Sequence, residues 1–226
     1  MTPENKKELI KLLSSYVTDA RLAKMHNVLS RRTRYLTLVM EDIYQAQNAS
    51  AVLRSCECFG VQDVHIIENR NVYQVNPDVA LGANKWLSIH KYNKADHNTL
   101  DCLTSLKHKG YKLIATTPHK NDCLLEELPL DKKTALLFGT ELKGLSEEAI
   151  SMADGFMKIS MAGFTESFNS SVSAAICLYH LAPRIRKEVI NWQLTEEERT
   201  DILIEWLMGS VNNSEGLIRH FKNSER

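Results

Sequence analysis

Three separated clusters of polar residues and glycines supply the groups that could do chemistry. In chain order they are Asn48 with Arg54; Gly139, Glu141 and Gly144; and Ser167, Asn169, Ser170 and Ser171. The second and third clusters follow two short apolar runs, 134–139 and 156–161, and each leads into a helix start. Such turns gather backbone N–H groups and small polar side chains at one edge of a sheet, where open α/β folds bind small ligands. We therefore expect a small-ligand site at this edge.

Common nucleotide and hydrolase motifs do not fit these turns. Gly139 and Gly144 have the glycine spacing of a phosphate-binding P-loop, but Leu145 stands where that motif needs its lysine. The sequence contains no dinucleotide fingerprint G-x-G-x-x-G and no nucleophile elbow G-x-S-x-G. Triphosphate, NAD and serine-hydrolase chemistry are therefore disfavoured.

Cysteine spacing and charge narrow the class of protein further. The five cysteines include no C-x-x-C pair, so we expect neither a disulfide framework nor a metal site. Lys/Arg and Asp/Glu balance at 28 each, yet the first 34 residues carry eight basic against three acidic side chains, which suits contact with an anionic polymer. With neither a signal core nor an apolar run of roughly 18 residues, we expect a cytoplasmic protein without a membrane span.

The elements that must position the three clusters alternate between strand and helix. Apolar or β-rich runs predict strands, and periodic segments predict helices between them. Strands are expected over 35–40, 61–67, 86–92, 111–116, 134–139 and 156–161, and helices over 49–59, around 100–106 and after 171. Gly60 is expected to end the first of these helices, and 68–84 to form a long loop with one helical turn. This alternation predicts an α/β fold with a mostly parallel sheet and helices on both faces.

The ends of the chain have a helical pattern of their own. Thr2 before Pro3 predicts one N-terminal helix, Thr18 or Asp19 starts a second, and Thr195 opens an acid-capped helix near the C-terminus. The expected organisation is a basic N-terminal helical extension over 1–34, a catalytic domain over 35–183 and a C-terminal helical tail over 184–226.

Three motifs carry a resemblance to a known family. N-x-x-A-x-x-R from Asn48 to Arg54, L-L-F-G-T-E-x-x-G-L-S over 136–146 and I-S-M-x-G-x-x-x-S-x-N-x-S-V-S-A-A over 159–175 occur in this order. In this the chain resembles the SpoU family (SPOUT superfamily) of RNA ribose 2′-O-methyltransferases, over about residues 27–183. The resemblance implies a deep trefoil knot near 137–175, S-adenosylmethionine as cofactor, and a homodimer with the knot region in its interface.

Within the family, a bare catalytic domain with helical extensions is most similar to the members that methylate tRNA. The resemblance thus implies methyl transfer from S-adenosyl-L-methionine to the ribose 2′-hydroxyl of a guanosine in tRNA, expected at guanosine 18 of the D-loop. The alternatives are a ribosomal-RNA 2′-O-methyltransferase of the same family, and a catalytically silent RNA-binding or assembly protein on the same fold. The methyl transfer itself requires no metal.

The resemblance also implies roles for individual residues. The expected cofactor-binding residues are Thr116, Leu137, Gly139, Ile159, Met161 and Phe168, the expected catalytic residues are Arg54, Asn48, Glu141, Ser167 and Asn169, and the expected RNA contacts are Arg31, Arg32, Arg184 and Arg186. Several of these residues have a purely structural alternative. Arg54 could pair with Glu57 or Asp63, whereas Asn48 and Asn169 could cap helices.

Arg54 matches the arginine that the family is thought to use at the 2′-hydroxyl. A guanidinium is a poor base, because its pKa lies above about 12. Arg54 could therefore be a base activated by a nearby phosphate or by desolvation, or a cation that stabilises the forming alkoxide and holds a substrate phosphate. For Glu141, the sequence leaves open whether it orients Arg54, contacts a base edge or caps the helix that begins near Ser146.

Overall fold

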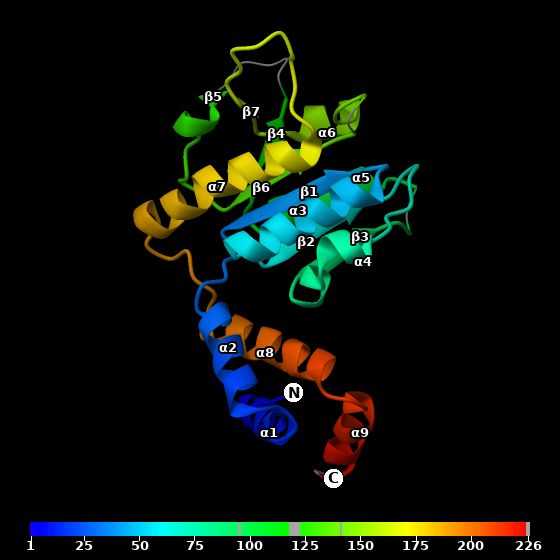
Figure 1. Cartoon of the computed structure of the whole chain (residues 1–226), viewed down its shortest axis with the longest axis vertical. Helices are drawn as coiled ribbons and strands as arrows, with labels where there is room; N and C mark the ends of the chain where they lie inside the picture. The colour runs from blue at the N-terminus through cyan, green and yellow to red at the C-terminus, as the bar shows by residue number, and fades with distance from the viewer. Residues whose placement is uncertain (95, 118–122, 141, 225–226) are drawn as a thin grey trace. The chain divides into compact units, whose positions relative to one another are not determined.

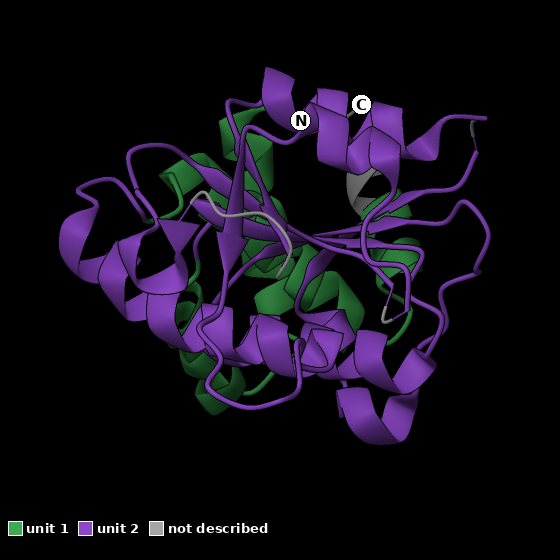
Figure 2. Ribbon diagram, turned by 90° about the horizontal axis from the view of Figure 1, so that it is seen from above, with its two compact units in different colours: residues 1–32, 193–226 green, residues 33–192 purple. Residues whose placement is uncertain are grey.

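The computed structural model of the chain describes residues 1–94, 96–117, 123–140 and 142–224. These residues form two compact units, which Figure 2 shows in different colours. Unit 1 combines Met1–Arg32 with Gln193–Arg226, and unit 2 spans Thr33–Trp192. The segment expected to be catalytic, 35–183, lies inside unit 2, which also includes 184–192.

Unit 2 is built on a parallel sheet. Across the described residues the sheet has seven strands in the spatial order β3-β2-β1-β6-β4-β7-β5 (Figure 1), and every neighbouring pair is parallel. The strands are β1 Leu36–Glu41, β2 Asp63–Ile67, β3 Ser88–Tyr92, β4 Lys112–Thr116, β5 Cys123–Leu124, β6 Thr134–Phe138 and β7 Gly155–Lys158. This order confirms the predicted α/β fold with a parallel sheet.

Helices cover both faces of this sheet. They are α3 Ala46–Phe59, α4 Pro77–Ala80, α5 Asn98–His108, α6 Glu147–Met152 and α7 Ser170–Glu188. α3 and α7 pack side by side over one face (Figure 1), and α5 and α6 pack over the other. Because successive strand residues point to opposite faces, Leu38 and Met40 of β1 join the core under α3 and α7, whereas Val39 joins the core under α5 and α6.

Local structure follows most of the expected signals. α3 ends as predicted at Gly60, which has the left-handed φ of 81°, but it begins at Ala46, so Asn48 lies in its first turn rather than in a loop. Between the strands expected over 111–116 and 134–139, where the sequence predicts no further strand, the structure has the short strand β5 and a 3-10 turn, Leu125–Glu127.

Helix α7 continues past Pro183, where the sequence suggested a change of character. A proline inside a helix removes one backbone hydrogen bond and usually kinks or ends it. The residue before Pro183 and the one two positions after it are buried in the core, with Ala182 4% and Ile185 1% exposed. Packing of this apolar face therefore outweighs the lost bond, and the helix reaches Glu188.

Unit 1 is helical, and three of its helices, α1, α2 and α8, begin where the sequence predicts. It contains α1 Pro3–Ser14, α2 Asp19–Leu29, α8 Glu196–Ser210 and α9 Ser214–Ser224. Thr2 and Thr18 cap α1 and α2 through their hydroxyls, and Thr195 forms a reciprocal capping box with Glu198. Lys6 of α1 forms an ion pair with Asp201 of α8 at 2.5 Å.

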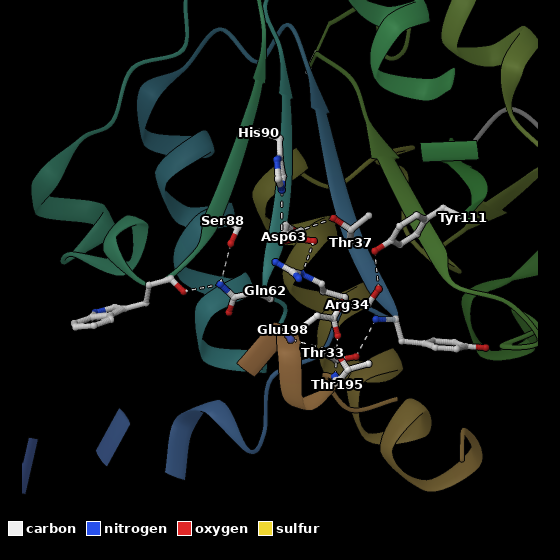
Figure 3. Close-up of polar contacts among 12 residues, drawn as sticks. Thr33, Arg34, Thr37, Gln62, Asp63, Ser88, His90, Tyr111, Thr195 and Glu198 are labelled. Atoms are coloured by element: carbon white, nitrogen blue, oxygen red, sulfur yellow. Dashed lines mark hydrogen bonds and ion pairs between the residues drawn. The ribbon is translucent and has the colours of Figure 1, made fainter. Parts of the chain in front are cut away.

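A polar network holds the amino ends of β1, β2 and β3 together (Figure 3). Asp63 Oδ2 lies 3.0 Å from Arg34 Nε, and Asp63 Oδ1 lies 3.5 Å from His90 Nε2. Gln62 donates to the carbonyl of Trp86 and to the hydroxyl of Ser88. Burial opposes ionisation of Asp63, but the neighbouring His90 and the charge of Arg34 lower the pKa of this carboxyl below its ordinary value.

Candidate active site

A cavity of about 460 Å³ lies at the carboxyl ends of β4, β6 and β7, where the two glycine-rich turns meet. Its apolar lining comes mainly from strand ends and the turn before α6, and its polar lining from the turns and the start of α7. The lining residues are Thr116, Thr117, Phe138, Gly139, Thr140, Leu142, Lys143, Gly144, Leu145, Ile150, Met157, Lys158, Ile159, Met161, Glu166, Ser167, Phe168, Ser170 and Ser173. Both the size and the mixed lining are typical of small-ligand sites.

Two glycines form one wall of this cavity by direct backbone contact. Thr140 and Gly144 exchange backbone hydrogen bonds of 3.0 and 2.9 Å, and Gly144 has a left-handed φ of 67°. A Cβ atom added to Gly139 would overlap the backbone of Gly144 and Leu145. Only glycine at position 139 therefore permits this closed turn.

The start of α7 joins the first and third sequence motifs. Asn169 caps the helix, with its Oδ1 accepting from the backbone N–H of Ser171 at 2.9 Å. Its Nδ2 donates to Asn48 Oδ1 at 3.2 Å, and Asn48 is only 8% exposed in the first turn of α3. The structure thus brings two of the predicted catalytic residues into contact, although neither is among the described residues that line the cavity.

Arg54 lies on α3, exposed to solvent, and is not among the described residues lining the cavity. It is six positions after Asn48, which corresponds to about 9 Å along the helix axis. Within the described part of the chain, Arg54 makes no hydrogen bond or ion pair. The alternative partner Asp63 is instead engaged by Arg34 and His90.

Most of the residues expected at the cofactor line the cavity. Thr116, Gly139, Ile159, Met161 and Phe168 do so, as does the predicted catalytic Ser167. Their contact with a cofactor stays a prediction. Leu137 is different, because it is 1% exposed and sits behind the wall, where its carbonyl accepts a 2.7 Å hydrogen bond from the Thr116 hydroxyl. Glu141 lies outside the described residues.

Sequence reasoning missed the charged groups of the cavity. Lys143, Lys158 and Glu166 line it together with the predicted residues. Lys143 lies between Gly139 and Gly144, and Glu166 directly precedes Ser167. Their positions within the motifs were the signal in the sequence that could have indicated a place in the site. Position alone does not distinguish a lining side chain from one that faces solvent.

The four predicted RNA-contact arginines differ in their exposure to solvent. Arg31 is exposed on unit 1, but Arg32 is 1% exposed, with its guanidinium 5.4 Å from the centre of the Trp206 ring. Arg184 forms an ion pair with Glu188 and donates to the carbonyls of Glu126 and Leu128. Both guanidinium groups are thus engaged in packing or hydrogen bonds within the chain, and an RNA contact by Arg32 or Arg184 stays a prediction.

The side chain of Arg186 is exposed, although it makes contacts within the chain. Its Nη2 donates to the Phe59 carbonyl at 2.7 Å, and the guanidinium lies 5.7 Å from the centre of the Trp192 ring. Because the group remains exposed, an RNA contact by Arg186 stays a prediction.

The described residues contain no group of three or more His, Cys, Asp or Glu side chains that could hold a metal ion. Among the helices of the described chain, none is long and apolar enough to cross a membrane.

The fold, the closed glycine turn and the motif contacts define a class of protein. Residues 35–179 match the SpoU rRNA Methylase family, and the chain belongs to this family. This confirms the resemblance carried by the three motifs.

Individual relatives are similar over most of the chain. A protein of Borreliella burgdorferi named tRNA (guanosine(18)-2′-O)-methyltransferase is 43% identical, over 90% of this chain and 92% of its own length. The crystal structure of the A. aeolicus TrmH/SpoU tRNA modifying enzyme has a TM-score of 0.77 at 28% identity, over 86% of this chain and 98% of that chain. AviRb from Streptomyces viridochromogenes, a SpoU methyltransferase solved with AdoMet, shares the fold with a TM-score of 0.60 at 20% identity, over 71% of this chain and 64% of that chain.

Proposed function

We propose that the chain transfers a methyl group from S-adenosyl-L-methionine to the ribose 2′-hydroxyl of guanosine 18 in tRNA. The observation that carries this proposal is the site itself: motifs two and three line one cavity, and the Asn169–Asn48 hydrogen bond ties them to the motif that bears Arg54. Relatives named for this reaction match the chain over most of both lengths.

The cavity suits S-adenosylmethionine in size and chemistry. Its walls offer apolar side chains such as Leu145, Ile150 and Ile159 for an adenine ring, and backbone polar groups at the turn of Gly139. Glu166 and Lys158 offer opposite charges for the amino and carboxylate groups of a methionine moiety. When bound, S-adenosylmethionine supplies the methyl group as an electrophilic sulfonium.

The chain's own contribution is to position the ribose hydroxyl and to favour loss of its proton. We assign this role to Arg54, whose guanidinium is exposed and makes no hydrogen bond or ion pair within the described chain. A guanidinium stays protonated at neutral pH, so we favour the role of a cation that holds the forming alkoxide or an adjacent phosphate. Asn48 and Asn169, which are hydrogen-bonded to each other, would hold the start of α3 in place and orient the ribose. Glu141 and Ser167 are the other two residues expected to be catalytic.

We extend the proposal to the knot and to a homodimer. The fold shared with the TrmH/SpoU enzyme supports a trefoil knot over about 137–175. Two apolar side chains of α7, Val172 at 44% and Tyr179 at 72%, are exposed in the single chain and suit burial against a second copy. A cytoplasmic location, where tRNA is available, belongs to the same proposal.

For the RNA, we propose that Arg31 and Arg186 contact phosphates. Both side chains are exposed, and phosphate contacts of this kind position a nucleic acid without reading its sequence. Arg32 and Arg184 are left out of this role because of the contacts they make within the chain.

The test is methyl transfer from labelled S-adenosylmethionine to unmodified tRNA and, in parallel, to ribosomal RNA, followed by mapping of the labelled nucleotide. The proposal expects label at guanosine 18 of tRNA and none on ribosomal RNA. Label on ribosomal RNA alone would keep the chemistry and overturn the substrate. Cofactor binding without transfer to either RNA would favour the silent RNA-binding alternative.

A further inference from the structure

Glu41 is a buried carboxylate whose role the proposed reaction does not explain. It ends β1 and is 3% exposed. Its Oε1 accepts hydrogen bonds from the hydroxyls of Thr99, at 2.6 Å, and Ser146, at 2.7 Å. Its Oε2 accepts from the backbone N–H of Ser146 at 2.8 Å. Burying a carboxylate is costly unless several donors satisfy it, and here three donors do so.

The strand pattern explains how Glu41 reaches these partners. Alternate residues of β1 face opposite sides of the sheet, and Glu41 falls on the same side as Val39, which packs under α5 and α6. Thr99 lies in the first turn of α5, and Ser146 caps α6 by accepting from the N–H of Ala149 at 3.1 Å. One carboxylate thus joins the end of β1 to the starts of two helices.

Ser146 stands between residues that form the cavity wall. Gly144 and Leu145 precede it and line the cavity, and Ile150 lines the cavity one helical turn later. The Ile150 N–H donates to the Ser146 carbonyl at 3.0 Å, so the position of Ser146 also sets that of Ile150. A displacement of Ser146 would therefore move both sides of this wall.

We propose that Glu41 is a positioning residue that holds the glycine-rich turn and the start of α6 in the geometry that binds the cofactor. This inference rests on the proposed function, because it takes the cavity to be the cofactor site. Glu41 does not line the cavity, and it acts through the two hydrogen bonds from Ser146.

The substitution Glu41→Gln tests this role with little change in volume. A glutamine oxygen can still accept from the two hydroxyls at Oε1, but its NH₂ group would then face the N–H of Ser146, so a charge-assisted bond becomes a contact between two donors. Thr99→Val is the matched control, because it removes one hydroxyl donor and leaves both Ser146 bonds in place.

We expect Glu41→Gln to raise the dissociation constant for S-adenosylmethionine, measured by calorimetry, about tenfold or more, because a hydrogen bond to a charged group contributes on that scale. KM for tRNA should stay within about twofold, and Thr99→Val should change cofactor affinity less than about threefold. Amide hydrogen exchange should rise over 139–152 in Glu41→Gln and not in the strands β1 and β6.

Unchanged cofactor binding in Glu41→Gln would overturn the inference, and so would exchange that rises throughout unit 2, which would mark a general structural role. If Glu41→Gln does not fold, Ser146→Ala removes one of the two bonds, and wild-type cofactor affinity in that variant would overturn the inference equally. A wild-type protein that binds the cofactor without methylating tRNA would refute the proposed function alone, because the binding comparison remains readable. If the wild type binds no cofactor, the exchange over 139–152 decides the role of Glu41.

Discussion

The buried histidine His65 on β2 should make the stability of unit 2 sensitive to acid. Its side chain is 2% exposed, stacks on His90 with the ring centres 4.7 Å apart, and has Nδ1 3.3 Å from the Tyr92 hydroxyl. Burial, with a smaller contribution from the charges of His90 and Lys109, lowers the pKa of His65 to about 3, against the opposing effect of Asp63. The folded protein therefore resists protonation of this ring.

The linkage between this pKa and stability gives a definite magnitude. In the unfolded chain the pKa of a histidine is about 6.5, whereas that of His65 in the folded chain is about 3. Between pH 6.5 and pH 3 the unfolded state therefore binds a proton that the folded state does not bind. Above pH 6.5 His65 is neutral in both states and does not reduce the stability of the fold. As the pH falls below 6.5, protonation of this residue in the unfolded state lowers the free energy of unfolding. Between pH 8 and pH 5 this protonation should lower the free energy of unfolding by about 2 kcal/mol.

The assay compares His65→Phe with the wild type in urea unfolding at pH 8, 7, 6 and 5, followed by fluorescence and circular dichroism. Phenylalanine keeps an aromatic ring beside His90 and cannot titrate, so the wild type should lose about 2 kcal/mol more than the variant over this range. His26→Gln, an exposed histidine on α2, serves as the control and should follow the wild type. Parallel profiles for wild type and His65→Phe would refute the assignment.

Three further predictions concern the site and the RNA. Gly139→Ala should weaken S-adenosylmethionine binding by about tenfold or more in calorimetry, because the added Cβ meets the backbone of Gly144; binding equal to wild type would contradict the closed turn. Arg54→Ala should lower turnover about 100-fold or more in single-turnover assays while cofactor affinity stays within about twofold, and retained turnover would remove Arg54 from the mechanism. Arg31→Ala should reduce the slope of log affinity for tRNA against log salt by about one. Arg32→Ala should leave this slope unchanged and lower the stability of unit 1 by about 1–2 kcal/mol, because the contact with Trp206 is lost. The opposite pattern would indicate that Arg32, and not Arg31, contacts the RNA.

Much of the fold could be predicted from the sequence because local signals are strong there. The apolar runs that became β1, β2, β4 and β6 are buried in the sheet, and Gly60 and Thr195 mark helix boundaries by conformation and capping chemistry. The position of β6 between β1 and β4 could not be predicted from these local signals. Strand order depends on pairing between distant segments, which periodicity does not encode.

Other features that the sequence did not reveal have physical causes of the same kind. Proline at position 183 indicates a helix end, but burial of Ala182 and Ile185 keeps α7 intact beyond it. Arg32 sits in a basic segment that suits RNA, and only the folded chain reveals Trp206 beneath its guanidinium. Glu41 ends a strand like many exposed carboxylates, and its three donors come from Thr99 of α5 and from Ser146, the cap of α6, far away in sequence.

The most direct test of the central claim compares two tRNA substrates that differ by one oxygen atom. One carries guanosine at position 18 and the other 2′-deoxyguanosine, and both are incubated with labelled S-adenosylmethionine and the wild-type chain. We predict methylation of the guanosine substrate and none at position 18 of the deoxy substrate, which keeps the base and lacks the nucleophile. Equal labelling of the two substrates, or label at another nucleotide of the guanosine substrate, would contradict ribose methylation at guanosine 18.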